Sequence, residues 1–277
     1  MAAATNITQI KRQMLAGKGF FRPFMHVNAG ASTAANSGCG FFTAGLSCNA
    51  IGTTYPSTLV GFQMPPATAS LRSSFFENMT NAQRAGWWGY FYRFGTVDLT
   101  TSGVGRFTHD STFTRLRRTV MGTANTNINV LPLIYVTAAS ATSNYLFSLE
   151  YVDQDGNTTS GSLNNTFPSV TTAAQSLYFI FMNDGDCAVQ NVTDTGVGQT
   201  CTAGTASIYG FEPLFFWAPH ASGEMNYVDT VFGGLKMGDI RPATPDAGTV
   251  TSFLGVLHII SANGVANAGF ISGFENV

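Results

Sequence analysis

The chain has 277 residues, which is enough for one large or two small domains with a substantial hydrophobic core. Only 10% of the residues are charged, against about a quarter in a typical globular protein, while 13% are aromatic. The aromatic content excludes a disordered chain, and no uncharged apolar run reaches the roughly 18 residues of a membrane-spanning helix. Low charge combined with many aromatic residues favours a surface that is largely buried against other chains.

The charges are unevenly distributed along the chain. Residues 1–118 hold 11 of the 13 Lys and Arg residues and three acidic residues, whereas residues 119–277 hold two basic and 12 acidic residues. One interpretation is that the loops simply differ in composition. The other is that a basic surface docks on the acidic surface of the next copy or of another partner.

The N-terminal segment predicts a short helix. Apolar residues recur at helical spacing within Thr5–Ala16, Thr5 can cap its start, and Gly17 can end it. Lys11 and Arg12 lie on the other face. This helix is either an arm that docks on a neighbouring subunit or an ordinary terminal helix packed on its own domain.

No secretory signal opens the sequence, because Met1–Ala4 lacks a basic region and an apolar core. We therefore expect cytosolic synthesis, which favours free thiols, although the first two cysteines could close a small loop. The four cysteines allow three pairings, and none has the Cys-x-x-Cys spacing of a zinc site. They are Cys39, Cys48, Cys187 and Cys201.

The first half of the chain predicts loops and a few strands. The small residues of 28–52 indicate a loop with short strands, residues 58–64 a strand, and residues 71–84 a short helix. The most aromatic strand is expected at residues 87–94, and it either fills a sandwich core or forms an exposed strip for bases or sugars. The strip would present Trp87, Trp88 and Tyr90.

A basic run lies in the strand expected at Thr108–Thr119. Arg115 and Arg117 fall on one strand face, and Arg118 follows. Three arginines in four residues could contact nucleic acid, but a solvated or interface strand fits a net-acidic chain better. Together with Lys11 and Arg12, these arginines are the candidate interface.

The strongest local signal is a β-hairpin at Asn144–Leu163. Side chains alternate between apolar and mixed faces up to residue 152, and Asp155-Gly156 then turns the chain, because glycine takes positive φ without steric cost. Before it, Pro132 within the apolar run of residues 127–137 predicts an edge strand or a bulge. We expect Gly156→Val to destabilise the fold by ~1–3 kcal/mol.

The second half continues with strands. A buried strand is expected at residues 173–182 and ends at a second turn that includes Gly185 and Asp186. Further strands are expected at residues 187–192, 203–218, 228–237 and 253–262, with a last strand or tail at 263–277. The pattern predicts an all-β fold, a jelly-roll-like antiparallel β-sandwich with a short N-terminal helix. We expect an arm at residues 1–25 and one sandwich domain at residues 26–277.

No motif indicates catalysis, and we predict neither a metal nor a cofactor. The four histidines lack ligand spacing, and no Gly-x-Ser-x-Gly elbow is present. The start of a calcium loop is mimicked by Asp153, Asp155 and Asn157, but its sixth position is Thr158 and its twelfth is Asn164. A hairpin turn is the better interpretation, so Asp155, Gly156, Gly185 and Asp186 are predicted to be structural.

Two segments carry a resemblance to a known family. The strand, turn and strand of LEYVDQDGNTTSG, followed by YFIFMNDGDCAVQNV and then by Phe211-Glu212-Pro213-Leu214, resemble a signature of virion structural proteins of tailed bacteriophages. The likeness covers residues 140–218, and the sequence departs from the pattern at Asp153, at Asn157 and in an inserted 71–86 segment.

The resemblance implies a virion component. We expect a non-enzymatic capsid decoration or cement protein that contacts the major capsid protein and forms a homotrimer, with no membrane or nucleic-acid partner. The alternatives are a tail or collar component and a carbohydrate-binding or host-receptor-binding module. A glycan hydrolase is a further alternative, since sequence alone does not place two carboxylates together.

Overall fold

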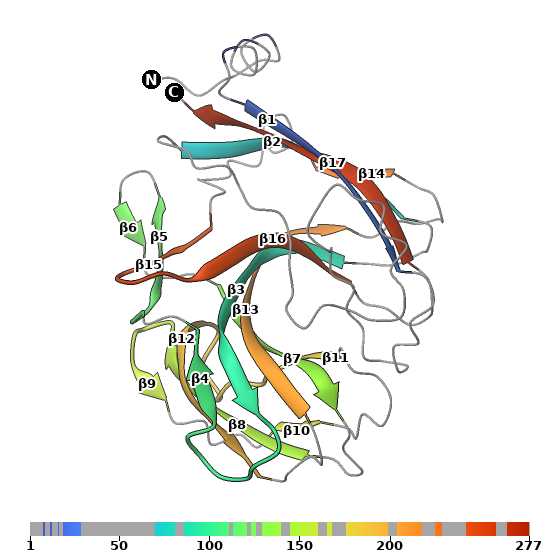
Figure 1. Ribbon diagram of the computed structural model, residues 1–277. Coiled ribbons are helices and arrows are strands. Elements are labelled where there is room, and N and C mark those ends of the chain that lie inside the picture. Colours follow the sequence, from blue (N-terminus) through green and yellow to red (C-terminus); the bar gives the residue numbers. More distant parts are fainter. Residues whose placement is uncertain are drawn as a thin grey trace.

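The computed structural model describes residues 8, 12, 16, 19–28, 70–80, 86–110, 113–120, 123–125, 129–139, 145–159, 165–167, 176–198, 204–217, 225–228, 242–258 and 265–276. Figure 1 shows that this part of the chain is built almost entirely of β-strands, and their pairings are antiparallel. The strands are β1 (Gly19–Asn28), β2 (Ser70–Thr80), β3 (Gly86–Asp98), β4 (Phe107–His109), β5 (Leu116–Val120), β6 (Thr123–Asn125), β7 (Leu131–Ala139), β8 (Tyr145–Asp153), β9 (Thr158–Thr159), β10 (Asn165–Phe167), β11 (Ser176–Phe179), β12 (Val189–Val197), β13 (Gly204–Trp217), β14 (Met225–Val228), β15 (Thr244–Pro245), β16 (Thr251–His258) and β17 (Val265–Asn276).

The strand order is that of a jelly roll. When its eight strands are lettered B to I along the chain, a jelly roll has one sheet in the order B-I-D-G and a second in the order C-H-E-F. Here β3-β13-β7-β11 reproduces the first sheet, with β16 added beyond β3, and β12-β8-β10 reproduces H-E-F of the second. The prediction of an all-β, jelly-roll-like sandwich is confirmed.

Aromatic side chains fill both faces of the larger sheet. One face carries a buried cluster formed by Phe91, Leu133, Tyr135, Tyr209, Phe211 and Phe253. The other face carries Phe94, whose ring lies 5.8 Å from that of Phe113. The Phe113 carbonyl accepts a hydrogen bond from Asn191 of β12, so this second face is directed at the sheet of β8, β10 and β12. Of the two interpretations of residues 87–94, the sandwich core is correct for Tyr90, which is 1% exposed.

The predicted hairpin is present. Along β8, Phe147, Leu149 and Tyr151 are buried while the intervening side chains are partly exposed, as the alternation predicts. Gly156 has a φ of 88°, which confirms the turn. The return strand begins with β9, which pairs with one end of β8, and β10 pairs with the other end.

Three expected elements differ from the structure, wholly or in part. Residues 70–80 form β2 instead of a short helix, because pairing with both β17 and β14 outweighs a weak helical pattern. β7, the strand that holds Pro132, is not an edge strand, because β11 and β13 flank it. It does carry the alternative irregularity, in its register with β13 between Val136 and Ala138, and Pro132 itself is tolerated as the second residue of the strand, beyond the end of β11. In the described end of the strand expected to be buried at residues 173–182, Phe179 is 44% and Phe181 75% exposed at the edge of the sheet, although Ile180 between them is buried.

A further sheet joins the two ends of the described chain. Its order is β1-β17-β2-β14, and β1 pairs with β17 over ten residues. Figure 1 shows this sheet beyond β16, on the opposite side from β8 and β10. The expected division into residues 1–25 and 26–277 stays a prediction, with β1 spanning its boundary.

The N-terminal helix is described at only a few positions. Thr8 and Arg12 are helical, and the Ala16 N–H donates to the Arg12 carbonyl at 2.9 Å. The rest of the expected helix lies outside the described residues, as do the strand expected at residues 58–64 and the loop at residues 29–52.

Candidate functional site

In a jelly roll, strand C lies beside strand H, which is β12 here. In this structure an irregular segment takes that place instead of a long strand. Gly103 exchanges two backbone hydrogen bonds with Val197 at one end of β12, with N···O distances of 2.8 and 2.9 Å. Further along, the Gly105 N–H donates to Asp194 at 2.9 Å. The buried Asn191 amide donates to the carbonyls of Phe113 and Thr114.

Side chains also protect the backbone of this outer edge of β12. The N–H of Val192 donates to the Asn191 side chain at 2.8 Å, and the N–H of Thr195 donates to the Asp194 side chain at 2.7 Å. His109 Nε2 lies 3.3 Å from the Thr193 carbonyl oxygen and donates to it in the Nε2–H tautomer. The β8–β12 register also has two irregularities. The side-chain hydrogen bonds and these irregularities both discourage another strand from pairing with this edge.

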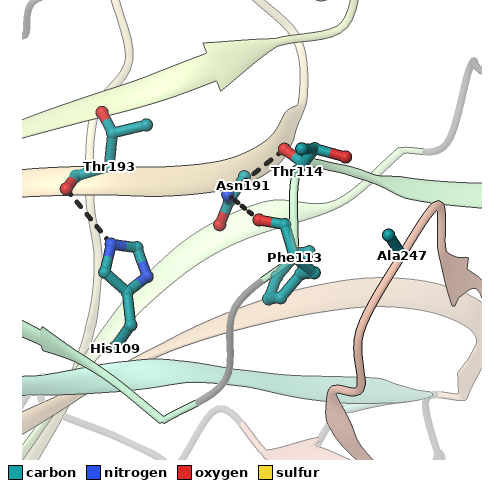
Figure 2. Close-up of a pocket in the computed structure, with 6 residues that line it drawn as sticks. All are labelled: His109, Phe113, Thr114, Asn191, Thr193 and Ala247. Atoms are coloured by element: carbon teal, nitrogen blue, oxygen red, sulfur yellow. Dashed lines mark hydrogen bonds between the residues drawn. The ribbon is translucent and has the colours of Figure 1, made fainter.

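A groove lies between this edge and the segment that faces it. Figure 2 shows His109 at one side of the groove and the Asn191 hydrogen bonds beside Phe113. Two adjoining hollows, of about 330 and 530 Å³, share Phe113, Thr114, Asn191 and Thr193. The groove therefore has a volume typical of small-ligand sites.

A three-residue charge cluster adjoins the groove. Arg115 Nε donates to Asp246 Oδ2 at 2.9 Å, and Arg117 Nε pairs with the other oxygen of the same carboxylate. Pairing of β15 with β5 brings Asp246 to this position. Arg115 lines the groove together with Gly156, whereas Arg117 does not. The common strand face expected for the two arginines agrees with their shared partner.

The other candidate interface residues are placed less fully. Arg12 is exposed on the helical segment. Arg118 lies in β5, but its side chain is outside the described residues, as is Lys11 altogether. An interface role for these residues stays a prediction.

The two predicted structural turns are joined to each other. The Tyr151 hydroxyl donates to Asp186 at 2.5 Å and accepts from the Asn183 N–H at 2.9 Å. The Cys187 N–H donates to the Gln154 side chain at 3.0 Å, and Gly185 has a φ of 95°. Burial and the bond to Asp186 raise the pKa of Tyr151 well above its ordinary value.

The carboxylate of Asp153 organises the first turn. Its Oδ1 accepts from the N–H groups of Asp155 and Asn157, both at 2.8 Å. A carboxylate so engaged by its own turn supports the interpretation of the calcium-like sequence as a hairpin. Within the described residues, no group of three or more His, Cys, Asp or Glu side chains could hold a metal ion.

The last part of the quoted motif is also structural. Glu212, 7% exposed, accepts a hydrogen bond of 2.6 Å from the Tyr92 hydroxyl. That hydroxyl accepts in turn from the Ala243 N–H at 2.7 Å. Glu212 therefore fastens β13 to β3 and to the segment before β15. Of the aromatic strip proposed for sugars, Tyr90 is buried and the partly exposed Trp87 packs against the core cluster, whereas the Trp88 side chain lies outside the described residues.

Comparisons with known proteins do not assign the chain to a family. No family model and no curated protein matches it. A structure of the infectious bursal disease virus Gx strain is 12% identical, with 94% of this chain and 66% of that chain covered and a TM-score of 0.16. A VP2 subviral particle of infectious bursal disease virus is also 12% identical, with 94% and 61% covered and a TM-score of 0.16.

This chain spans 66% or less of the length of these two structures. Such TM-scores do not amount to a shared overall fold, so the fold rests on the strand order alone. The part of the chain that the structure describes holds no helix long and apolar enough to cross a membrane.

Proposed function

We propose that this chain is a non-enzymatic structural subunit of a virus particle. The observation that carries the proposal is the strand order β3-β13-β7-β11 and β12-β8-β10. Double-sheet jelly rolls of this order serve as capsid domains, lectins and cupins. A cupin uses a ligand cavity inside its sheets, whereas buried tyrosine and phenylalanine side chains pack the interior here. A packed interior suits a load-carrying shell protein.

The chemistry of the site supports a structural role. His109, the one histidine whose side chain is described, bonds a backbone carbonyl and not a nucleophile. The polar residues of the quoted motifs, Gln154, Asp186 and Glu212, hold turns and strands together. Their role in the fold explains why such a motif would mark a family of structural proteins.

Within the particle, we propose a capsid decoration or cement protein of a tailed bacteriophage that contacts the major capsid protein. The resemblance of residues 140–218 to virion proteins of tailed phages supports this placement. A tail or collar component is the alternative, and the number of copies distinguishes them. A decoration protein occurs in tens to hundreds of copies set by capsid symmetry, whereas a tail or collar protein occurs in far fewer.

We further propose that the subunit forms a closed homotrimer. Low charge and exposed apolar side chains such as Phe181 and Val104 support self-association. The segregation of charge is in part satisfied within one chain, because Arg115 and Arg117 of the basic part hold Asp246 of the acidic part. The burial of apolar surface between subunits is therefore the main source of the trimer's stability. The charges mainly orient the subunits as they meet.

Two experiments test the function. Quantitative mass spectrometry of purified particles should find the chain at a copy number fixed by symmetry, and its absence from washed particles would refute the proposal. Light scattering coupled to size-exclusion chromatography should find a trimer at micromolar concentration. A monodisperse monomer would refute the trimer but leave the copy-number test standing.

A further inference from the structure

The groove beside β12 is lined by both polar and apolar residues. The polar residues include Thr114, Thr193 and Arg115, and the apolar residues include Phe113 and Val152. This mixture suits a ligand with both an apolar face and a rim of hydroxyl groups. A sugar ring has this character, because its C–H bonds form one face and its hydroxyls lie around the edge.

The groove is poorly suited to an added β-strand. A strand would need the backbone N–H and C=O groups along the edge of β12. The N–H groups of Val192 and Thr195, the Thr193 carbonyl and both groups of Val197 already have partners. An occupant must therefore be recognised by side chains. This favours a small polar molecule over a peptide arm from another subunit.

The charge cluster supplies directional donors at one end. The Arg115 contact with Asp246 runs through Nε, which leaves the two Nη groups of a planar fork beside Gly156. Such a fork matches two oxygen atoms of a carboxylate or two neighbouring hydroxyls. Two guanidinium groups share one carboxylate, so the fork is not fully neutralised by its own chain.

We propose that this groove binds a saccharide of one or two rings, with Arg115 as the residue that holds its oxygen atoms. The combined hollows, of about 330 and 530 Å³, have room for a disaccharide. The sugar would lie against Val152 and the exposed edge of Phe113, with its rim toward Thr114 and Arg115. The site is additional to the proposed shell function and does not depend on it.

The chain offers a matched pair of variants for the test. Arg115→Gln and Arg117→Gln each remove one guanidinium from Asp246, and the two side chains are 35% and 31% exposed. Only Arg115 lines the groove. A third variant, Thr114→Trp, fills the groove from an exposed position without touching the ion pairs.

The full-length protein is titrated with cellobiose, N,N′-diacetylchitobiose and a glucuronic-acid-containing disaccharide, with saturation-transfer NMR as the readout. The neutral and acidic sugars distinguish hydroxyl from carboxylate recognition by the fork. For the best ligand, we expect at least tenfold weaker binding for Arg115→Gln and for Thr114→Trp, and less than a twofold change for Arg117→Gln.

Three results would overturn the proposal. The first is no saturation transfer from any of the three sugars at millimolar concentration. The second is an equal loss for the two arginine variants. The third is full binding by a folded Thr114→Trp protein, which would place the sugar elsewhere.

Discussion

Replacing Gly156 with alanine perturbs the hairpin turn in two separable ways. Its φ of 88° lies in a region that costs a residue with a Cβ about 1–2 kcal/mol. The new Cβ would also lie 2.8 Å from Nη1 of Arg115, so the guanidinium must move. Because the Arg115–Asp246 pair is about a third exposed, its weakening adds only ~0–1 kcal/mol. We expect a total loss of ~1–3 kcal/mol.

Gly185 provides the matched control. Its φ of 95° imposes the same kind of backbone cost, but nothing lies within 4 Å of its added Cβ. Gly185→Ala should therefore lose only ~1–2 kcal/mol. Gly156→Ala in an Arg115→Gln background should lose the same amount, because no guanidinium is left to displace.

Urea denaturation followed by circular dichroism measures these losses, with a Tm shift of roughly 2–4 °C per kcal/mol as a second readout. An unchanged midpoint for Gly156→Ala would show that the turn does not need positive φ. A larger loss in the Arg115→Gln background than in the wild-type background would contradict the displacement of the guanidinium.

Three further changes test other contacts. Asp246→Asn should cost about 1 kcal/mol or less and should make stability less sensitive to salt, as followed by urea midpoints at low and high ionic strength; an unchanged salt response would contradict the shared ion pair. Asn191→Ala should cost ~2–4 kcal/mol, because buried carbonyls of the facing segment lose their donor, and a neutral result in the same assay would remove the anchor assigned to Asn191. Tyr151→Phe should cost ~1–2 kcal/mol at neutral pH. Because folding raises the pKa of Tyr151, its stabilising contribution is complete below about pH 10 and declines above it, so the difference from wild type should shrink in alkaline denaturation curves.

The strand pattern of the sandwich could be predicted wherever local signals were strong. The alternation in β8, the Asp-Gly turn and the aromatic run of β3 each depend on neighbours in sequence. β2 could not be predicted in this way, because its strand is stabilised by partners about 150 and 200 residues away. Pro132 predicted an edge strand or a bulge, and only the tertiary pairing of β7 with β11 and β13 decides between the two.

Most of the groove could not be predicted from the sequence. Arg115 and Arg117 carried a signal as a basic run, but their common partner, Asp246, lies about 130 residues away. His109 and Thr193 belong to no quoted motif, and Asn191 is only the next-to-last residue of the quoted segment YFIFMNDGDCAVQNV. What brings them together is the irregular segment at the place of strand C, which only the strand order reveals.

The central claim is that this jelly roll is a structural subunit of a virus particle, and cryo-electron microscopy of purified particles tests it most directly. We predict density at symmetry-related positions that fits the β3-β13-β7-β11 and β12-β8-β10 sheets with β16 beyond β3. Intact, infectious particles without such density, from a preparation that also lacks peptides of this chain, would contradict the account.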